Sequence, residues 1–117
     1  MEQNRRRTGA AYEERAAAYL ESMGVQIICR NYRTRYGEID LIGLDGPYLI
    51  FVEVKYRSSG RMGAPLEAVD SRKRQKIIQM ARRYLSEHHY REDAPVRFDC
   101  VGMTPEKTEW IRNAFTA

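Results

Sequence analysis

Four charged side chains interrupt the most apolar segment of the sequence, GEIDLIGLDGPYLIFVEVKYR at residues 37–57: Glu38, Asp40, Glu53 and Lys55. Carboxylates and a lysine are the groups that bind metal ions and assist hydrolysis, so their place in a strand-like segment requires an explanation. The Asp-Gly-Pro sequence at residues 45–47 is a strong turn signal. The segment therefore predicts a β-hairpin with strands at about 36–44 and 48–56.

The predicted turn fixes which residues of the two strands lie opposite each other. If Asp45 and Tyr48 flank the turn, Asp40 faces Glu53, and Glu38 faces Lys55. Side chains alternate across a strand, so both pairs lie on one face of the hairpin. That face is apolar near the turn and charged at its far end. The opposite face is almost wholly apolar and is expected to pack in the core: Ile39, Leu41, Gly43, Ile50, Val52, Val54 and Tyr56.

Opposed carboxylates in a hairpin repel each other unless a cation or a proton neutralises them. Directly opposed residues lie about 5 Å apart at Cβ, and crowded acidic groups cost stability. Carboxylate oxygens suit Mg²⁺ or Mn²⁺, which often also bind a phosphate oxygen of the substrate. Lys55 would then orient the attacking water or offset charge on the phosphate. The pattern indicates metal-assisted hydrolysis of a phosphodiester.

Two other interpretations use the same four residues. Glu38 and Lys55 can form an ordinary cross-strand ion pair, with Asp40 and Glu53 in water at the end of the sheet. Spacing alone does not separate this interpretation from the metal site. A retaining glycosidase also needs two carboxylates about 5 Å apart, but a chain of 117 residues with a single Trp offers little room for a sugar cleft.

The remaining sequence predicts one α/β domain at residues 9–117, after a disordered basic arm at residues 1–8. A helical pattern runs from about Gly9 to Met23, and a strand follows from Val25. Residues 58–63 are expected to form a loop that could cover substrate. A long helix runs from Ser71 to about His88, and the segment VRFDCVG at 96–102 reads as a strand. The order α-β-β-β-α-β indicates a mixed sheet with helices packed on it.

Composition is compatible with a nucleic-acid partner, and the cysteines favour a cytoplasmic location. The net charge is +4, and sixteen Arg residues stand against four Lys. Guanidinium groups suit phosphate, although the same excess is expected from a GC-rich genome. The sequence contains no apolar run of about 18 residues or more, so no membrane span is expected. Cys29 and Cys100 are isolated, which favours two free thiols in a reducing compartment.

The motifs GEIDLI and FVEVKYR, in this order, resemble the YraN family of the PD-(D/E)XK nuclease superfamily. The resemblance extends to YEERAAAYLESMGVQIICRNYR before them and to RFDCV after them, and it covers about residues 9–115. It implies a restriction-endonuclease-like fold. It also implies a metal-dependent nuclease that acts on structured or branched DNA, with DNA favoured over RNA as the substrate.

The resemblance assigns roles to individual residues. It makes Asp40 and Glu53 metal ligands and Lys55 the catalytic lysine, while Ile39 stands where the superfamily pattern has proline. The first-helix acid of the pattern falls on Glu13. Helical periodicity agrees, because Glu13 shares a face with apolar residues, although its neighbour Glu14 is an alternative.

Basic residues around these motifs are candidates for contact with nucleic acid: Lys73, Arg57, Arg33 and Arg35. Lys73 is equally well explained as a surface lysine whose stem covers apolar neighbours. The competing hypothesis for the whole chain is a nucleic-acid-binding or adaptor module that keeps the nuclease fold without catalysis. A homodimer, or a partner protein that supplies specificity, is a further possibility.

Overall fold

A computed structural model describes residues 2–57 and 71–117, with side chains from residue 9 onward, and it confirms the predicted α/β class. The elements are α1 (Glu2–Ser22), β1 (Gln26–Thr34), β2 (Gly37–Asp45), β3 (Tyr48–Tyr56), α3 (Ser71–Glu87), β4 (Val96–Met103) and β5 (Thr108–Phe115). The predicted order is present, and β5 extends it at the C-terminal end. The loop expected to cover substrate, at 58–63, lies outside the described residues. No helix in the described ranges is long and apolar enough to span a membrane.

Helix α1 begins and ends with local signals in the sequence. It starts at Glu2, so it already includes residues 2–8, which we expected to form a disordered arm. This stretch contains no proline and is rich in Arg, Glu and Gln, which are good helix formers. At the other end, Gly24 has a φ of 96°, and the N–H of Val25 donates to the carbonyl of Leu20 at 3.0 Å. This Schellman motif ends the helix as predicted.

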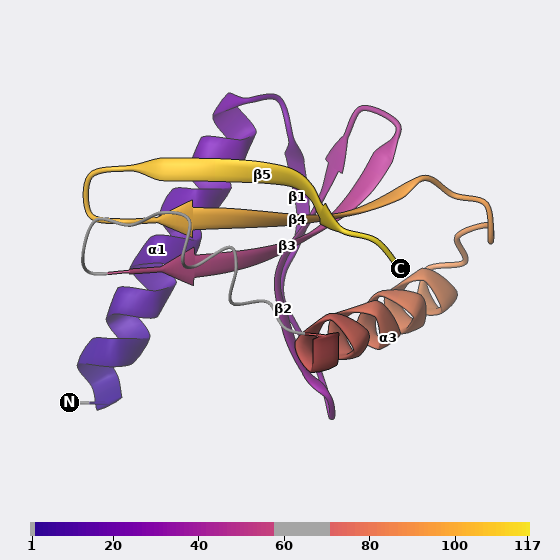
Figure 1. The fold of residues 1–117 in the computed structure, drawn as a ribbon, viewed down its shortest axis with the longest axis horizontal. Helices are drawn as coiled ribbons and strands as arrows, with labels where there is room; N and C mark the ends of the chain where they lie inside the picture. The colour runs from indigo at the N-terminus through magenta and orange to yellow at the C-terminus, as the bar shows by residue number, and fades with distance from the viewer. Residues whose placement is uncertain (1, 58–70) are drawn as a thin grey trace.

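The five strands form one mixed sheet in the order β1-β2-β3-β4-β5. Every neighbouring pair is antiparallel except β3 and β4, which are parallel and are separated in the chain by α3. Figure 1 shows a strong twist, with β1 and β2 running across the direction of β4 and β5. The parallel pairing places the end of β3, which carries Lys55, beside Gly102 of β4.

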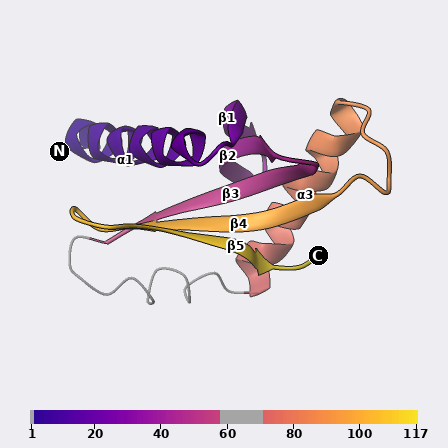
Figure 2. The same ribbon diagram turned by 90° about the horizontal axis from the view of Figure 1, so that it is seen from above.

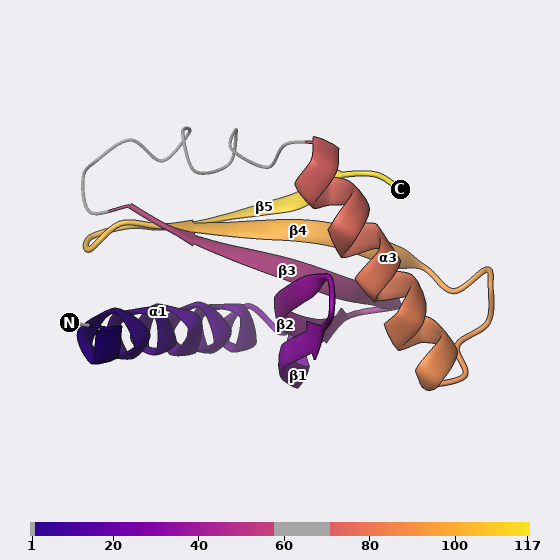
Figure 3. The same ribbon diagram turned by 90° about the horizontal axis from the view of Figure 1, so that it is seen from below.

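The two helices cover opposite faces of the sheet, so the core has two layers (Figure 2). Ala16, Ala17 and Leu20 of α1 pack on Ile50 and Val52. On the other face, α3 crosses the strands (Figure 3) and packs on the aromatic side chains of the sheet: Phe51, Phe98 and Phe115. Because both faces are buried, β2 and β3 read as nearly continuous apolar runs in the sequence.

The hairpin of β2 and β3 has the predicted register near its turn. The pairs run from Asp45–Tyr48 to Leu41–Val52. In the described chain the ladder ends there, so the predicted pairs Asp40–Glu53 and Glu38–Lys55 are not part of it. Beyond the end of the ladder, the N–H of Val54 donates to a side chain of β2 instead of to its backbone: it bonds Asp40 Oδ2 at 2.8 Å.

Side-chain alternation along β2 also changes at this point. Ile39 and Ile42 both pack on the α3 side although they are three residues apart, which corrects the expectation that Ile39 lies with Leu41. The change lies where the β2–β3 ladder ends at Leu41 and Asp40 turns its side chain toward the N–H of Val54. The neighbouring strand is irregular here too, because Asn31, between the residues of β1 that pair with Leu41 and Ile39, has a φ of 56°.

A buried ionic network fixes the far edge of the sheet. Asp99 is 1% exposed and accepts hydrogen bonds from Arg97 at 2.8 and 2.9 Å, from Trp110 Nε1 at 2.9 Å and from the N–H of Asn113 at 2.9 Å. Arg97 also bonds Asp45 at 2.7 Å. The carboxylate of Asp99 is thereby fully used in holding β5 on β4.

Candidate metal and nucleic-acid site

Three carboxylates meet where the β2–β3 ladder ends. Glu13 of α1 and Glu38 and Asp40 of β2 offer ligand atoms that all lie within 4.8 Å of one another. All three side chains are partly buried. Oxygen atoms at this spacing can coordinate one hard divalent cation.

The environment of Asp40 opposes its ionisation. Burial raises the pKa of this carboxyl from 3.8 to about 7, and the nearby charges of Glu53, Glu13 and Glu38 contribute to the rise. The hydrogen bond from the N–H of Val54 acts in the opposite direction but does not compensate. A bound cation would remove this repulsion.

Glu13 is held at the cluster by contacts of its neighbours. The rings of Tyr12 and Tyr56 stack at 3.6 Å between centroids, which ties α1 to the end of β3. With its amide oriented to donate, Asn31 lies 2.9 Å from Glu13 Oε2 and 2.8 Å from Glu38 Oε1. Burial and the charge of Glu38 raise the pKa of the Glu13 carboxyl. Glu14, the alternative first-helix acid, is exposed and pairs with Arg30 instead.

Glu53 lies on the α3 side of the sheet and contacts two lysines. Its Oε1 is 2.6 Å from Lys73 Nζ and 3.5 Å from Lys55 Nζ. Burial lowers the pKa of Lys55, and the adjacent Lys73 lowers it further. Burial has the same effect on Lys73, but contacts with Glu53 and Lys55 outweigh it and raise the pKa of Lys73. The structure thus gives the two lysines different electrostatic environments.

Of the three predicted arginines, Arg33 contacts the carboxylate cluster, and Arg35 and Arg57 lie outside it. Arg33 forms an ion pair with Glu38 at 2.8 Å, and its side chain is 79% exposed. Arg35 donates to the hydroxyl of Tyr36 at 2.8 Å and lies over its ring. Arg57 is exposed at the end of β3, where its N–H bonds the carbonyl of Met103.

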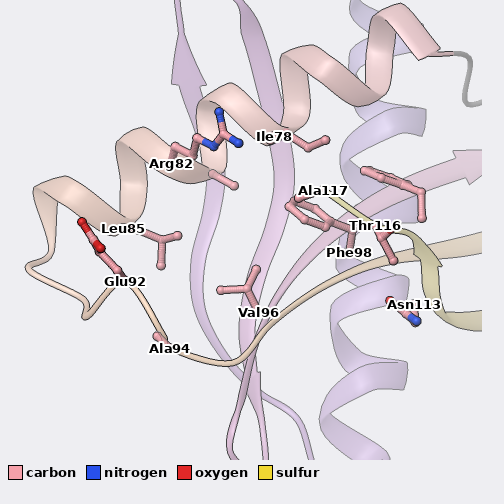
Figure 4. Close-up of a pocket in the computed structure, with 12 residues that line it drawn as sticks. Ile78, Arg82, Leu85, Glu92, Ala94, Val96, Phe98, Asn113, Thr116 and Ala117 are labelled. Atoms are coloured by element: carbon pink, nitrogen blue, oxygen red, sulfur yellow. The ribbon is translucent and has the colours of Figure 1, made fainter.

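A separate apolar pocket of about 300 Å³ lies between α3 and the opposite end of the sheet (Figure 4). Leu85, Val96 and Phe98 form much of its wall, with Arg82 and Glu92 also lining it. None of the predicted site residues lines this pocket, so we place the candidate chemistry at the carboxylates.

Comparison with known proteins identifies the family. A family model described as "Uncharacterised protein family UPF0102" matches residues 12–103. The chain belongs to the UPF0102 family. This finding confirms the resemblance that the motifs indicate.

Relatives within the UPF0102 family match nearly the whole chain. A UPF0102 protein of Lachnoclostridium phytofermentans is 44% identical over 114 residues, which cover 97% of each chain. One from Halorhodospira halophila is 44% identical over 110 residues, or 94% of this chain and 88% of that protein. One from Methylococcus capsulatus is 44% identical over 114 residues, or 94% and 91%. The names of these relatives state family membership and no activity.

The UPF0102 chain brings most of its predicted site residues into two adjoining groups. Glu13 and Asp40 lie in the carboxylate cluster, and Lys55 contacts Glu53, whose charge acts on Asp40. The predicted register placed Glu38 opposite Lys55, with an ion pair as one of two interpretations, and missed its place beside Glu13. The signal in the sequence for an irregular β1 next to Glu38 was Asn31, since asparagine is among the few residues that adopt a left-handed conformation readily.

Proposed function

We propose that this UPF0102 chain is a divalent-metal-dependent nuclease that hydrolyses phosphodiester bonds, with structured or branched DNA as its substrate. The observation that carries the proposal is the carboxylate cluster beside two partly buried lysines. Glu13, Glu38 and Asp40 face one another, and Lys55 and Lys73 contact the adjoining Glu53. Acids alone suit many roles, but acids next to a lysine with a lowered pKa suit phosphodiester hydrolysis.

The residues present fit Mg²⁺ or Mn²⁺. Both ions prefer oxygen ligands, and the cluster offers carboxylate oxygens without a thiol or imidazole among them. We propose that Glu13, Glu38 and Asp40 hold the ion. Glu53, which the resemblance makes a ligand, lies outside this cluster and contacts Lys73 and Lys55 instead. When bound, the ion would supply Lewis-acid chemistry at a phosphate group.

Lys55 is the group proposed to act on the water that attacks phosphorus. Its ammonium group can orient this water or offset negative charge on the phosphate. Glu53 contacts Lys55 at 3.5 Å and thereby fixes the position of the ammonium group. Lys73 contacts the same carboxylate from α3 and adds positive charge where a substrate phosphate would lie.

The test is cleavage of a branched or flapped DNA in Mg²⁺ or Mn²⁺. Asp40→Ala is expected to abolish cleavage while the protein stays folded. Asp93→Ala is the matched control, because Asp93 pairs with the exposed Arg91 in a loop. Equal cleavage by Asp40→Ala and wild type would indicate a contaminating nuclease and would refute the proposal.

The alternative is a nucleic-acid-binding or adaptor module that retains the nuclease fold. One contact favours it: Lys73 already neutralises Glu53 at 2.6 Å without a metal. A Mn²⁺ titration separates the two functions. Site-specific binding that Asp40→Ala abolishes supports the enzyme, whereas DNA binding that depends on salt and is indifferent to metal supports the module.

A further inference from the structure

A groove of about 320 Å³ adjoins the carboxylate cluster and runs between the start of β2 and the start of α3. We call it the Tyr36 groove; its walls include Tyr36, Glu38, Arg72, Lys73 and Lys76. Its volume is at the lower end of the range for small-ligand sites, which is roughly 300–1,000 Å³. The groove is therefore large enough to hold a small ligand of about the size of one nucleotide.

The Tyr36 groove is continuous with the proposed site. Glu38 lines the groove and also belongs to the carboxylate cluster. Lys73 lines the groove and contacts Glu53. A ligand in the groove would therefore lie directly beside the groups proposed to perform hydrolysis.

The charge of the groove favours an anion. Four cations, Arg72, Lys73, Arg74 and Lys76, lie in the first six residues of α3, and the first acid of this helix is Glu87. Cations at a helix N-terminus are unfavourable because this end already carries partial positive charge. Three of these cations line the groove, so their charge adds to the field of the helix there. A phosphate group would be stabilised by both.

The remaining walls suit a nucleobase. Ile77 and Met80 give the groove an apolar side, and Gly37 adds backbone without a side chain. Tyr36 is 39% exposed, and Arg35 holds its hydroxyl at 2.8 Å. An aromatic ring can stack on a base only if that base has a free face, and inside a duplex both faces are covered by neighbouring bases.

We propose that the Tyr36 groove binds one unpaired nucleotide of a DNA strand. Arg72 and Lys76 contact its phosphate, and its base packs against Tyr36. This inference rests on the proposed function, because it makes the bound nucleotide the neighbour of the cleaved bond. The substrate would then be a single strand, a flap or a frayed end rather than a blunt, fully paired duplex.

The experiment measures binding without cleavage. Fluorescence anisotropy in EDTA compares wild-type protein with labelled single-stranded DNA of about 12 nucleotides and with a blunt duplex of the same length. The single strand is expected to bind more tightly. Arg72→Ala combined with Lys76→Ala should weaken this binding and reduce the salt dependence by about 0.7 in log–log slope for each phosphate that the variant no longer neutralises.

Matched variants separate the groove from general charge and from folding. Arg82→Ala combined with Arg83→Ala removes the same charge from the other end of α3 and should leave most binding intact. Tyr36→Ala should weaken binding by about 5- to 150-fold, the range expected for loss of one stacked base, and Tyr36→Phe should restore it. Tyr48→Ala is its control, because Tyr48 is similarly exposed at 41% and lies at the hairpin turn.

A measurement on the unmodified protein removes any dependence on folded variants. Photocrosslinking of a strand that contains 5-iodouracil should label Tyr36 and leave Tyr48 unlabelled. Three results would overturn the inference: equal binding of duplex and single strand, equal losses in the two double variants, or no crosslink at Tyr36. Each concerns binding in EDTA, whereas failure of the nuclease proposal is read from cleavage by Asp40→Ala, so the two failures are distinguishable.

Discussion

Replacement of Asp40 by Asn is expected to stabilise the metal-free protein at pH 8. Burial and the neighbouring acids raise the pKa of Asp40 from 3.8 to about 7. Each pKa unit corresponds to about 1.4 kcal/mol, so the ionised side chain opposes folding by up to about 4 kcal/mol above pH 7. Water that reaches this partly buried group screens part of the repulsion. We therefore expect a gain of about 2–4 kcal/mol, since Asn can still accept the hydrogen bond from Val54.

The sign of the pH dependence follows from the direction of the pKa change. The folded protein keeps a proton on Asp40 up to about pH 7, whereas the unfolded chain loses it near 3.8. Between these values the folded state binds more protons, so wild-type stability falls as pH rises. The advantage of Asp40→Asn should shrink to less than about 1 kcal/mol at pH 4, where the wild-type carboxyl is protonated in the folded state and about half protonated in the unfolded chain.

Urea unfolding in EDTA, followed by Trp110 fluorescence, measures this difference. The chain has one Trp, and it is 8% exposed, so its emission should change on unfolding. Asp93→Asn is the matched control at an exposed carboxylate and should change stability by less than about 0.5 kcal/mol. Saturating Mn²⁺, at about 100 times its Kd, should stabilise the wild type by about 2.7 kcal/mol and the Asn variant much less. A gain that is absent at pH 8, or independent of pH, would refute the reasoning.

Three further predictions concern the proposed catalytic lysine and two positions that stabilise the fold. Lys55→Gln should lower the cleavage rate by about 100-fold or more while DNA binding in EDTA is retained; retained cleavage would remove Lys55 from the proposed mechanism. Asp99→Ala should cost about 3–5 kcal/mol in urea unfolding, because it removes a buried partner of Arg97 and of Trp110; a loss below about 1 kcal/mol would show that the network is not needed. Gly37→Ala should cost about 1–3 kcal/mol, because Gly37 has a φ of 137°; an unchanged unfolding midpoint would contradict that strain.

Much of the hairpin was predictable because its turn is encoded locally. The Asp-Gly-Pro sequence fixes the register from Asp45–Tyr48 to Leu41–Val52, and period-two alternation then assigns the faces near the turn. The motif residues Asp40, Glu53 and Lys55 could be named from the resemblance for the same reason, since they lie close together in the sequence. Their final contacts depend on helices and on β1, which are more distant in the sequence.

The errors have a common physical cause in contacts between distant elements. The alternation change near Asp40 lies where the β2–β3 ladder ends and Asp40 bonds Val54 instead, which the turn signal at residues 45–47 does not reveal. The link between Glu53 and Lys73 requires α3 to pack on β3, which hydrophobic periodicity indicates without fixing the contact. The bond between Asp99 and Trp110 likewise depends on the pairing of β5 with β4.

The division of the site along the chain has a consequence for how such proteins can diversify. Every carboxylate and lysine assigned to bond breaking, apart from Lys73, precedes residue 57, whereas the groove cations belong to α3. Substitutions on the exposed side of that helix can alter which DNA strands are bound, while the groups proposed to perform hydrolysis stay in place. A library limited to positions 72 and 76 would therefore search for new substrate preferences at little risk to turnover.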